Sequence, residues 1–404
     1  MIANLSTLPE RVNQCTCGHK HFDIAIEKIE ISNEAFEKAA AYLLEKSFTD
    51  VTIVTDEVIQ SVLGDSFHTV LKNNGINVHT CVVEKNNQGD VVANEEALVQ
   101  GLLETPNHTD VLLAVGSGTL HDITRFVSYK MGKPFISIPT APSVDGFNSM
   151  GAPVVVKGMK KTFQMQAPIA LFAQVDVLAK SPKKMIAAGF GDILGKYTSL
   201  TDWTFGHLVA DEPYCPLAAE ITNDALQYCV DHIEQIAAAN EEGVKILLEG
   251  LVASGLAMLL IGHSAPASGA EHHISHIWEM EFLRNDQPQI LHGAKVGVTA
   301  QIIAQLYKED FVAFLSDEQA LQELQQANDH PAIWKVITHK QEIIAAIDKI
   351  PSPAQLKQMI DDIGGDSTPE ALGVEQTLVQ TSLGEAHLIR DRFTMLYFSN
   401  HFIS

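Results

Sequence analysis

Short runs of β-branched and apolar residues alternate with helical spacing along the first 180 residues of the chain. The apolar runs predict strands at residues 51–55, 76–83, 110–115, 134–139, 153–157 and 170–177. Apolar positions three or four residues apart predict helices near 58–63, 93–103 and 123–129. Such an alternation predicts a mostly parallel sheet with helices on both faces.

After Ser181-Pro182 the strand signals give way to helical spacing. Helices are predicted near 183–210, 216–238, 241–262, 268–284, 294–308, 316–328, 332–348, 353–362 and 381–396. A chain of 404 residues is long enough for two domains. We predict an α/β domain at 1–180 and an all-helical domain at 181–404, with the ligand site between them.

Composition and charge exclude several kinds of partner. The apolar fraction of 46% and the charged fraction of 19% are typical of a soluble globular protein. The longest apolar stretch, Leu251–Gly262, is too short to span a bilayer and predicts a buried helix. A net charge of −23 repels nucleic acid and anionic membranes, so we expect neither as a partner. The N-terminus lacks the features of a signal peptide, so we expect a cytoplasmic protein.

The cysteines do not suggest a disulfide framework. There are five of them, at positions 15, 17, 81, 215 and 229, and we expect reduced thiols. One dense tract, Cys15-Thr-Cys17-Gly-His19-Lys-His21, combines thiols with imidazoles. A zinc site there would require a tight bend, because C-x-C is shorter than the usual C-x2-C. A loop or strand is the simpler interpretation, with zinc binding as the alternative.

Two loops that follow predicted strands could hold a nucleotide. In the first, Gly116-Ser-Gly-Thr119, the glycines would let backbone amides approach a pyrophosphate at a helix N-terminus. This turn lacks the full G-x-G-x-x-G pattern, so an ordinary β-α turn is the alternative. Asp56, at the end of an earlier strand, is a candidate for the ribose hydroxyls or a helix N-cap. In the second loop, Ile138–Gly146, Thr140 and Ser143 offer hydroxyls, although its prolines would equally build a rigid turn.

An Asp and several His residues form a candidate metal site. Asp192 lies in Gly189–Gly195, where three glycines predict a close backbone approach, although an isolated Asp is commonly an N-cap. His272 and His276 are four residues apart and share one helix face, and His292 follows them. One Asp and two His bind a divalent metal and leave a coordination position open, as a catalytic metal requires.

Five segments in this order resemble a known enzyme family. They are G-S-G-T-L-H-D at 116–122, I-P-T-A-P-S-V-D-G at 138–146, G-F-G-D-I-L-G-K at 189–196, S-G-A-E-H-H-I-S-H at 268–276 and L-H-G at 291–293. Together they resemble the glycerol-1-phosphate dehydrogenases of the bacterial type, within the iron-containing alcohol dehydrogenase and dehydroquinate synthase superfamily. The resemblance implies a Rossmann-like nucleotide-binding domain followed by a helical domain that binds metal and substrate.

The resemblance also implies a role for each matching residue. It implies metal ligation by Asp192, His272 and His292, with the neighbouring His273 as an alternative ligand. It implies substrate contacts by Asp145, Asp192 and His276, of which Asp192 and His276 are catalytic. It implies nucleotide contacts by residues of both loops and beside them, namely Asp56, Gly118, Thr119, Leu120, His121, Asp122, Thr140, Ala141, Pro142, Ser143 and Ser149.

The family interconverts dihydroxyacetone phosphate and sn-glycerol 1-phosphate for glycerophospholipid synthesis, with NAD(P)(H), zinc or nickel, and a homodimeric assembly. The ligand set suits zinc, nickel and Fe(II) about equally. We expect Asp56 to repel a 2′-phosphate and therefore to favour NADH. The candidates for holding the substrate phosphate are Lys160, Lys161, Lys196 and Lys295. The alternative is a solvated face, which is the favoured interpretation for Lys160 and Lys161. The alternatives are a glycerol dehydrogenase for the unphosphorylated substrate, a dehydroquinate-synthase-like lyase, and a nucleotide-binding regulator without catalysis.

Overall fold

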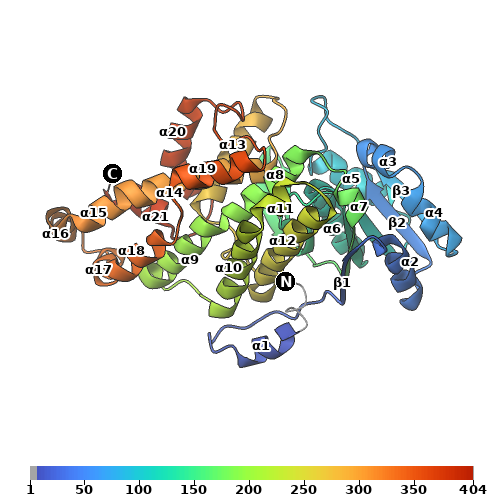
Figure 1. The fold of residues 1–404 in the computed structure, drawn as a ribbon, viewed down its shortest axis with the longest axis horizontal. Helices are drawn as coiled ribbons and strands as arrows, with labels where there is room; N and C mark the ends of the chain where they lie inside the picture. Colours follow the sequence, from blue (N-terminus) through green and yellow to red (C-terminus); the bar gives the residue numbers. More distant parts are fainter. Residues whose placement is uncertain (1–6, 404) are drawn as a thin grey trace.

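The computed structural model describes residues 7–403 and shows an α/β part followed by a helical part (Figure 1). The main sheet has six strands in the order β1-β8-β5-β4-β2-β3, and each neighbouring pair is parallel. Its strands are β1 (Lys28–Ser32), β2 (Asp50–Thr55), β3 (Asn77–Val82), β4 (Val111–Gly116), β5 (Phe135–Pro139) and β8 (Ala170–Gln174). The predicted mostly parallel sheet is confirmed.

Helices cover both faces of this sheet. Val51 and Ile53 of β2 pack with α2 (Ala35–Glu45) and α4 (Ser66–Asn73). Val54 of the same strand packs on the opposite face with α5 (Glu95–Glu104) and α6 (Gly118–Met131). The β-branched run of β2 is therefore buried on both sides, as a central parallel strand requires. The short helix α3 (Glu57–Leu63) follows β2 directly.

Two strands are absent from the expectations based on sequence. β1 lies at the edge of the sheet beside β8, and only Ile29 and Ile31 interrupt its polar residues, so its apolar pattern is too short to recognise. β7 (Met159–Gln164) is largely polar and pairs with β6 (Gly151–Val156) in a separate antiparallel hairpin. The strand predicted at 153–157 is thus real but lies outside the main sheet.

The helical part begins directly after β8 and extends to the end of the described chain. Its α-helices are α7 (Val175–Leu178), α8 (Lys183–Leu194), α9 (Lys196–Ala210), α10 (Pro216–Asp231), α11 (Ile233–Ala237), α12 (Glu241–Ile261), α13 (Ala270–Arg284), α14 (His292–Gln305), α15 (Val312–Ser316), α16 (Glu318–Ala327), α17 (Pro331–Thr338), α18 (Lys340–Asp348), α19 (Pro353–Asp362), α20 (Gln376–Glu385) and α21 (Met395–Phe398). Strands thus give way to helices between β8 and α8, while the domain boundary at residue 180 stays a prediction.

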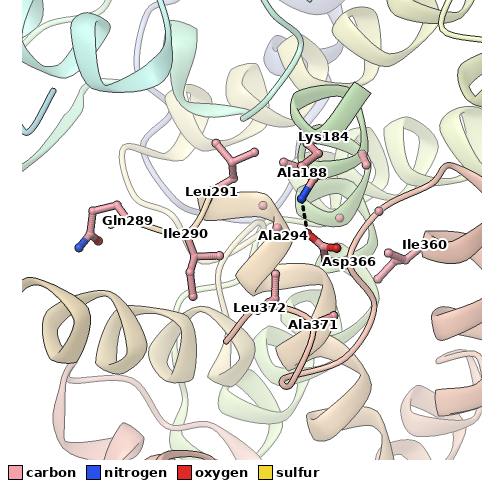
Figure 2. A pocket seen from close by; sticks show the side chains of 14 residues that line it. Lys184, Ala188, Gln289, Ile290, Leu291, Ala294, Ile360, Asp366, Ala371 and Leu372 are labelled. Atoms are coloured by element: carbon pink, nitrogen blue, oxygen red, sulfur yellow. Dashed lines mark hydrogen bonds and ion pairs between the residues drawn. The ribbon is translucent and has the colours of Figure 1, made fainter. Parts of the chain in front are cut away.

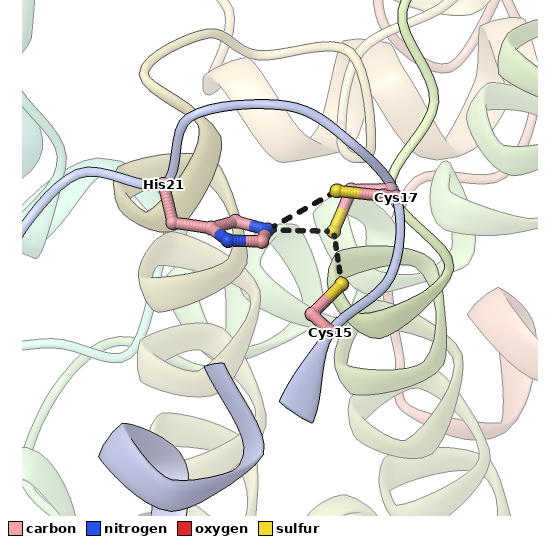
Figure 3. Close-up of side chains that lie close together, drawn as sticks. Cys15, Cys17 and His21 are labelled. Atoms are coloured by element: carbon pink, nitrogen blue, oxygen red, sulfur yellow. Dashed lines mark hydrogen bonds between the residues drawn. The ribbon is translucent and has the colours of Figure 1, made fainter. Parts of the chain in front are cut away.

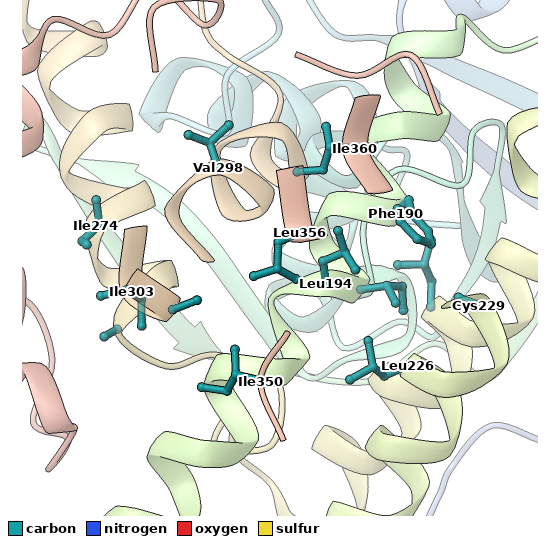
Figure 4. Close-up of a cluster of buried hydrophobic side chains, with 14 of the residues drawn as sticks. Phe190, Leu194, Leu226, Cys229, Ile274, Val298, Ile303, Ile350, Leu356 and Ile360 are labelled. Carbon is teal, nitrogen blue, oxygen red and sulfur yellow. The ribbon is translucent and has the colours of Figure 1, made fainter. Parts of the chain in front are cut away.

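One large core holds the helical part together (Figure 4). Phe190 and Leu194 of α8, Leu226 of α10, Ile303 of α14 and Leu356 of α19 all contribute to it. The helix predicted over 381–396 is wrong in its second half, because α20 ends at Glu385 and α21 begins only at Met395.

Helix α12 runs through the protein interior. By length and composition it is apolar enough to cross a membrane, but 78% of its most apolar window is buried inside the protein. The buried helix predicted from the apolar run is therefore confirmed. The N-terminal helix α1 (Leu8–Gln14) lies beside α10 and α12, on the helical side of the molecule (Figure 1).

Candidate active site

A cleft of about 530 Å³ lies where the carboxyl ends of the parallel strands meet the helical part. Asp56 follows β2, Ser117 and Gly118 follow β4, and Ser143 follows β5. Helices α13 and α14 form the facing wall with their histidines. The carboxyl edge of an open parallel sheet is where such folds bind ligands, and this volume is typical of a small-molecule site.

Three side chains from three helices meet beside this cleft, and the two histidines among them line it. Asp192 of α8, His272 of α13 and His292 of α14 place their ligand atoms within 4.8 Å of one another. His272 Nε2 lies 3.6 Å from Asp192 Oδ1, and the rings of His272 and His292 are 5.2 Å apart between centroids. His276 shares the helix face of His272, as their spacing predicts. The donor atoms and their separation fit one divalent metal.

Glycines allow α8 and α14 to approach closely enough to form this cluster. A Cβ atom on Gly191 would lie 2.3 Å from the Gly293 carbonyl oxygen, and one on Gly293 would lie 1.8 Å from the Ala188 carbonyl oxygen. The predicted close approach around Asp192 is confirmed. Asp192 lies inside α8 and is fully buried, so the N-cap interpretation is wrong.

A buried carboxylate orients the first histidine of the cluster. Glu271 Oε1 lies 2.7 Å from His272 Nδ1, and the same carboxyl group accepts from the Gly269 amide at 2.6 Å and the Thr198 hydroxyl at 2.7 Å. With Nδ1 donating to Glu271, the lone pair of His272 Nε2 faces Asp192. Metal-binding histidines commonly have such a partner. His273 is buried beside them, outside the cluster and the cleft lining, so it is excluded as the alternative ligand.

Lys196 bridges two carboxylates beneath the cluster. Its Nζ lies 2.7 Å from Asp145 Oδ2, 3.0 Å from Asp192 Oδ1 and 3.2 Å from the Ala267 carbonyl oxygen. Burial opposes ionisation of Asp192, yet the Lys196 ammonium lowers the pKa of this carboxyl group. Burial raises the pKa of Asp145, and the negative charge of the neighbouring Asp192 raises it further. Lys196 is fully buried between these partners and outside the cleft lining, so its expected contact with a substrate phosphate is not supported.

A group of cations lines the cleft beside His276. Lys160 of β7 lies 2.7 Å and Lys295 of α14 lies 3.2 Å from the same carboxylate, that of Glu279. Arg390 lies 3.1 Å from His276 Nε2 and donates to Ser264 and Ser268. Lys161, the neighbour of Lys160, is exposed and outside the lining, so its expected phosphate contact is not supported.

Arg390 is the functional candidate that the sequence did not reveal. Its side chain lines the cleft and makes no ion pair with a carboxylate in residues 7–403. Burial, together with the nearby Arg392, lowers the pKa of Arg390 to about 10. In the sequence, Arg390 was one charged residue in a segment predicted to be helical. The structure places it in the break between α20 and α21.

Six of the predicted nucleotide-binding residues line the cleft. They lie in the two loops or near them, and are Asp56, Gly118, Thr119, Asp122, Ser143 and Ser149. Helix α6 begins at Gly118, where a Cβ would lie 2.9 Å from Val144 Cγ2, so glycine lets the two loops pack without a shift of Val144. Asp56 caps α3 through the Ile59 amide at 2.9 Å and also lines the cleft. Its capping role is thus confirmed, without excluding a ribose contact.

Five other predicted nucleotide residues lie outside the cleft lining. They are Leu120, His121, Thr140, Ala141 and Pro142, all buried. The His121 ring bonds to the Ser117 carbonyl oxygen and the Ser137 hydroxyl, each at 2.8 Å, and burial lowers its pKa to about 3. This histidine fixes the first loop onto β5. The arrangement does not support direct side-chain contact of these five residues with a nucleotide.

A second pocket, of about 240 Å³, lies between α8, α14 and α19 (Figure 2). Alanine and glycine residues of α8 and α14 form much of its wall. Its two charged lining residues, Lys184 and Asp366, lie 3.3 Å apart and pair with each other. The metal cluster and the cation group face the larger cleft instead.

Comparison with known proteins places this site in a family. Glycerol-1-phosphate dehydrogenase (NAD(P)+) of Geobacillus stearothermophilus is 51% identical over 401 residues, which cover 98% of each chain. The chain belongs to the glycerol-1-phosphate dehydrogenase family. A member of this family from Bacillus subtilis is 40% identical over 95% of this chain and 93% of its own. One from Pyrococcus furiosus is 28% identical over 86% of this chain and 85% of its own.

The family lies within a wider group with the same fold. Residues 30–182 match the iron-containing alcohol dehydrogenase family. A probable glycerol dehydrogenase from Sinorhizobium meliloti 1021 superposes with a TM-score of 0.63 at 15% identity, over 94% of this chain and 92% of that one. Maleylacetate reductase from Agrobacterium tumefaciens gives 0.64 at 12% identity, over 91% of each chain. These likenesses show the fold alone, and they confirm the predicted fold class.

Proposed function

We propose that this member of the glycerol-1-phosphate dehydrogenase family reduces dihydroxyacetone phosphate to sn-glycerol 1-phosphate, reversibly, with NAD(P)H. The observation that carries the proposal is that one cleft joins the Asp192, His272 and His292 cluster to the N-terminus of α6. The cluster suits a divalent metal with an open coordination position. The amide groups at the start of α6 suit the pyrophosphate of a nucleotide.

The charge of the cation group favours a phosphorylated substrate. Lys160 and Lys295 share one carboxylate, that of Glu279, and Arg390 pairs with Ser264, Ser268 and His276 instead, so the formal charge of these four ionisable groups is 3 − 1 = +2. A phosphate ester carries close to two negative charges at neutral pH. In a protein with a net charge of −23, this local excess distinguishes a phosphorylated substrate from free dihydroxyacetone or glycerol.

The chain's own residues would hold the substrate between these two sites. A divalent metal at the cluster would supply Lewis acidity to an oxygen of the substrate. Arg390 donates to His276 Nε2, so the imidazole proton is on Nδ1, which faces Glu279 at 3.7 Å. Burial and the neighbouring Lys160 lower the pKa of His276 well below its usual value, which keeps the ring neutral. We assign His276 and Arg390 to binding and orienting the substrate.

We propose Asp145 and Asp192 as further substrate contacts. Asp145 lines the cleft, and its amide donates to Asp192 Oδ2 at 2.9 Å, which ties the second nucleotide loop to the cluster. Lys196 holds both carboxylates in place. This arrangement supports a fixed distance between the nucleotide loops and the metal cluster, which hydride transfer to a bound ketone requires.

We further propose that zinc or nickel is the metal and that NADH is the preferred nucleotide. The carboxylate of Asp56 in the cleft lining supports the preference for NADH, because it would repel a 2′-phosphate. A cytoplasmic homodimer that supplies glycerophospholipid synthesis completes the proposal, and light scattering after gel filtration measures the assembly.

The test is metal-dependent NADH oxidation. Protein stripped with a chelator is reloaded with zinc, nickel or iron and offered dihydroxyacetone phosphate or dihydroxyacetone. We expect turnover of the phosphate ester only, giving a product that a dehydrogenase specific for sn-glycerol 3-phosphate does not oxidise. Preference for the free ketone would indicate a glycerol dehydrogenase. No turnover with bound metal and nucleotide would favour a lyase or a regulator.

A further inference from the structure

The cysteine-rich tract near the N-terminus folds into a cluster that the cleft does not use. The side chains of Cys15, Cys17 and His21 lie close together (Figure 3). Cys215, about two hundred residues later in the chain, completes the cluster. The four ligand atoms all lie within 4.8 Å of one another. None of the four residues lines the cleft.

The distances within this cluster match the edges of a tetrahedron around zinc. Zn–S bonds of about 2.3 Å and Zn–N bonds of about 2.0 Å give S···S edges of roughly 3.8 Å and S···N edges of roughly 3.5 Å. Cys15 Sγ lies 3.8 Å from Cys215 Sγ. His21 Nε2 lies 3.5 Å from Cys17 Sγ and 3.3 Å from Cys215 Sγ. A disulfide would instead require sulfurs about 2 Å apart.

We propose that Cys15, Cys17, His21 and Cys215 bind a structural zinc ion, separate from the metal of the cleft. Three thiolates and one imidazole complete four-coordination, so no position is left for a substrate or water, as in structural rather than catalytic sites. The tight bend that C-x-C spacing requires is present, with Gly18 at φ 76° immediately after Cys17. Cys215 supplies the ligand that the N-terminal tract lacks.

The N-cap position of Cys215 favours a negative ligand there. Cys215 is the N-cap of α10, and its sulfur accepts from the Ala218 amide at 3.5 Å. The positive end of the helix dipole stabilises a negative ligand at this position. His21 Nε2 is the nitrogen that faces the sulfurs, so the other ring nitrogen is available for solvent or a second partner.

The zinc ion would fasten the N-terminal segment to the helical part. Residues 15–27 form neither helix nor strand, and they connect α1 beside the helical part to β1 at the sheet edge. Around the cluster, Leu8 is buried against Trp203 and Leu217, and the Phe22 amide donates to the Leu260 carbonyl oxygen at 2.8 Å. Metal binding to such a segment contributes directly to folding free energy.

The same attachment supports one wall of the cleft. A Cβ on Gly262, at the end of α12, would lie 2.3 Å from the Phe22 ring, so this ring packs directly on the turn. Gly262, His263 and Ser264 in this turn all line the cleft. The zinc ion would therefore hold the segment whose Phe22 ring packs behind this wall of the cleft.

Cobalt substitution tests the site without reference to activity. Protein stripped of metal and loaded with cobalt should show thiolate-to-cobalt charge-transfer absorption, which the Asp/His/His cluster cannot produce. We expect this absorption in the wild type and in His292→Ala, and a clear weakening in Cys17→Ser, which leaves two of the three thiolates. His19→Ala is the matched control, because His19 lies in the same tract outside the cluster and should keep the absorption. A wild type without the absorption, or a Cys17→Ser variant that retains its full intensity, would overturn the proposal.

Metal counting and unfolding provide a second measurement should Cys17→Ser fold poorly. Zinc-saturated wild type should contain two ions per subunit, and His292→Ala should contain one. A mercurial thiol reagent should release this remaining ion of His292→Ala from the folded protein. The same reagent should lower the unfolding temperature of the wild type, and added zinc after thiol reduction should restore it. One ion in the wild type and none in His292→Ala would contradict the zinc site while leaving the proposed enzyme activity intact.

Discussion

Glu271 Oε1 lies 2.7 Å from His272 Nδ1, and both side chains are buried on the first turns of α13. Adjacent residues of a helix usually point in different directions. Here the carboxylate turns back to the neighbouring ring, held by the Gly269 amide and the Thr198 hydroxyl. The contact selects the tautomer and the orientation in which Nε2 faces Asp192. Glu271 therefore controls the geometry of the metal cluster without joining it.

The first prediction concerns this carboxylate. Glu271→Gln keeps the shape of the side chain but removes its charge, so metal affinity should fall about 10- to 100-fold. Equilibrium dialysis with zinc or nickel measures the change, and circular dichroism checks the fold. Glu281→Gln, on the same helix but facing Arg284, should leave affinity unchanged. Equal affinities in the two variants would show that Glu271 serves packing alone.

The second prediction concerns a proposed metal ligand. His292→Ala should lose the cleft metal and turnover together while the helical core keeps its packing, because the ring lies at the N-terminus of α14 on the cleft wall. Metal analysis and thermal unfolding measure the two effects. His339→Ala, a partly exposed position, is the control. An active variant that retains its metal would remove His292 from the ligand set.

The third prediction concerns Arg390. Arg390→Gln should raise KM for dihydroxyacetone phosphate about 10- to 100-fold, because hydrogen bonds to charged groups contribute about 1.5–3 kcal/mol. Inhibition by inorganic phosphate should weaken in parallel, while NADH affinity stays unchanged. The control is Arg284→Gln, which alters an exposed arginine paired with Glu281. A variant that loses NADH affinity instead would assign Arg390 to the nucleotide.

The fourth prediction separates the two roles of Asp56. Asp56→Asn retains an oxygen that can cap α3 through the Ile59 amide, so stability should change little. Loss of the negative charge should tighten NADPH binding relative to NADH, measured by fluorescence titration. Asp56→Ala should in addition cost about 1 kcal/mol of stability through the lost cap. An unchanged ratio of NADPH to NADH affinity would leave Asp56 with the capping role alone.

The fifth prediction concerns pH and His121. Burial lowers the pKa of His121 to about 3 in the folded protein, against about 6.5 in an unfolded chain. The unfolded chain therefore binds the extra proton, and this contribution to stability, present above pH 6.5, is lost as pH falls towards 3. His121→Gln should reduce the loss of stability between pH 7 and pH 5 by about 2 kcal/mol, measured by urea unfolding. A loss equal to that of wild type would contradict this assignment.

The sequence predicted the fold class because its signals are local. Continuous β-branched runs such as 51–55 mark strands buried on both faces, and their alternation with helices leaves few arrangements besides a parallel sheet. Edge strand β1 and hairpin strand β7 were not predicted, because polar residues interrupt their apolar patterns. The break before α21 was not predicted because Ile389, Phe393 and Leu396 maintain helical spacing through it.

The candidate site likewise contains residues that the sequence could indicate and residues that it could not. Residue type and helix periodicity indicated Asp192, His272, His276 and His292, since imidazoles four apart share a face and glycines around an Asp predict close backbone approach. The sequence could not separate cleft-lining residues of the nucleotide loops from buried ones such as His121 and Thr140. That distinction depends on which face of each loop packs against the sheet.

By itself, the sequence determined the kinds of ligand available, the alternation of strands and helices in the first part of the chain, and the motifs of the family. Only the tertiary structure decided which charges meet. Lys196 is neutralised between Asp145 and Asp192, Arg390 reaches the cleft from the C-terminal region, and Cys215 joins a tract about two hundred residues before it. The physical reason is that ligand geometry and electrostatic pairing depend on distances in space. Local patterns set only the distances within one helix or strand.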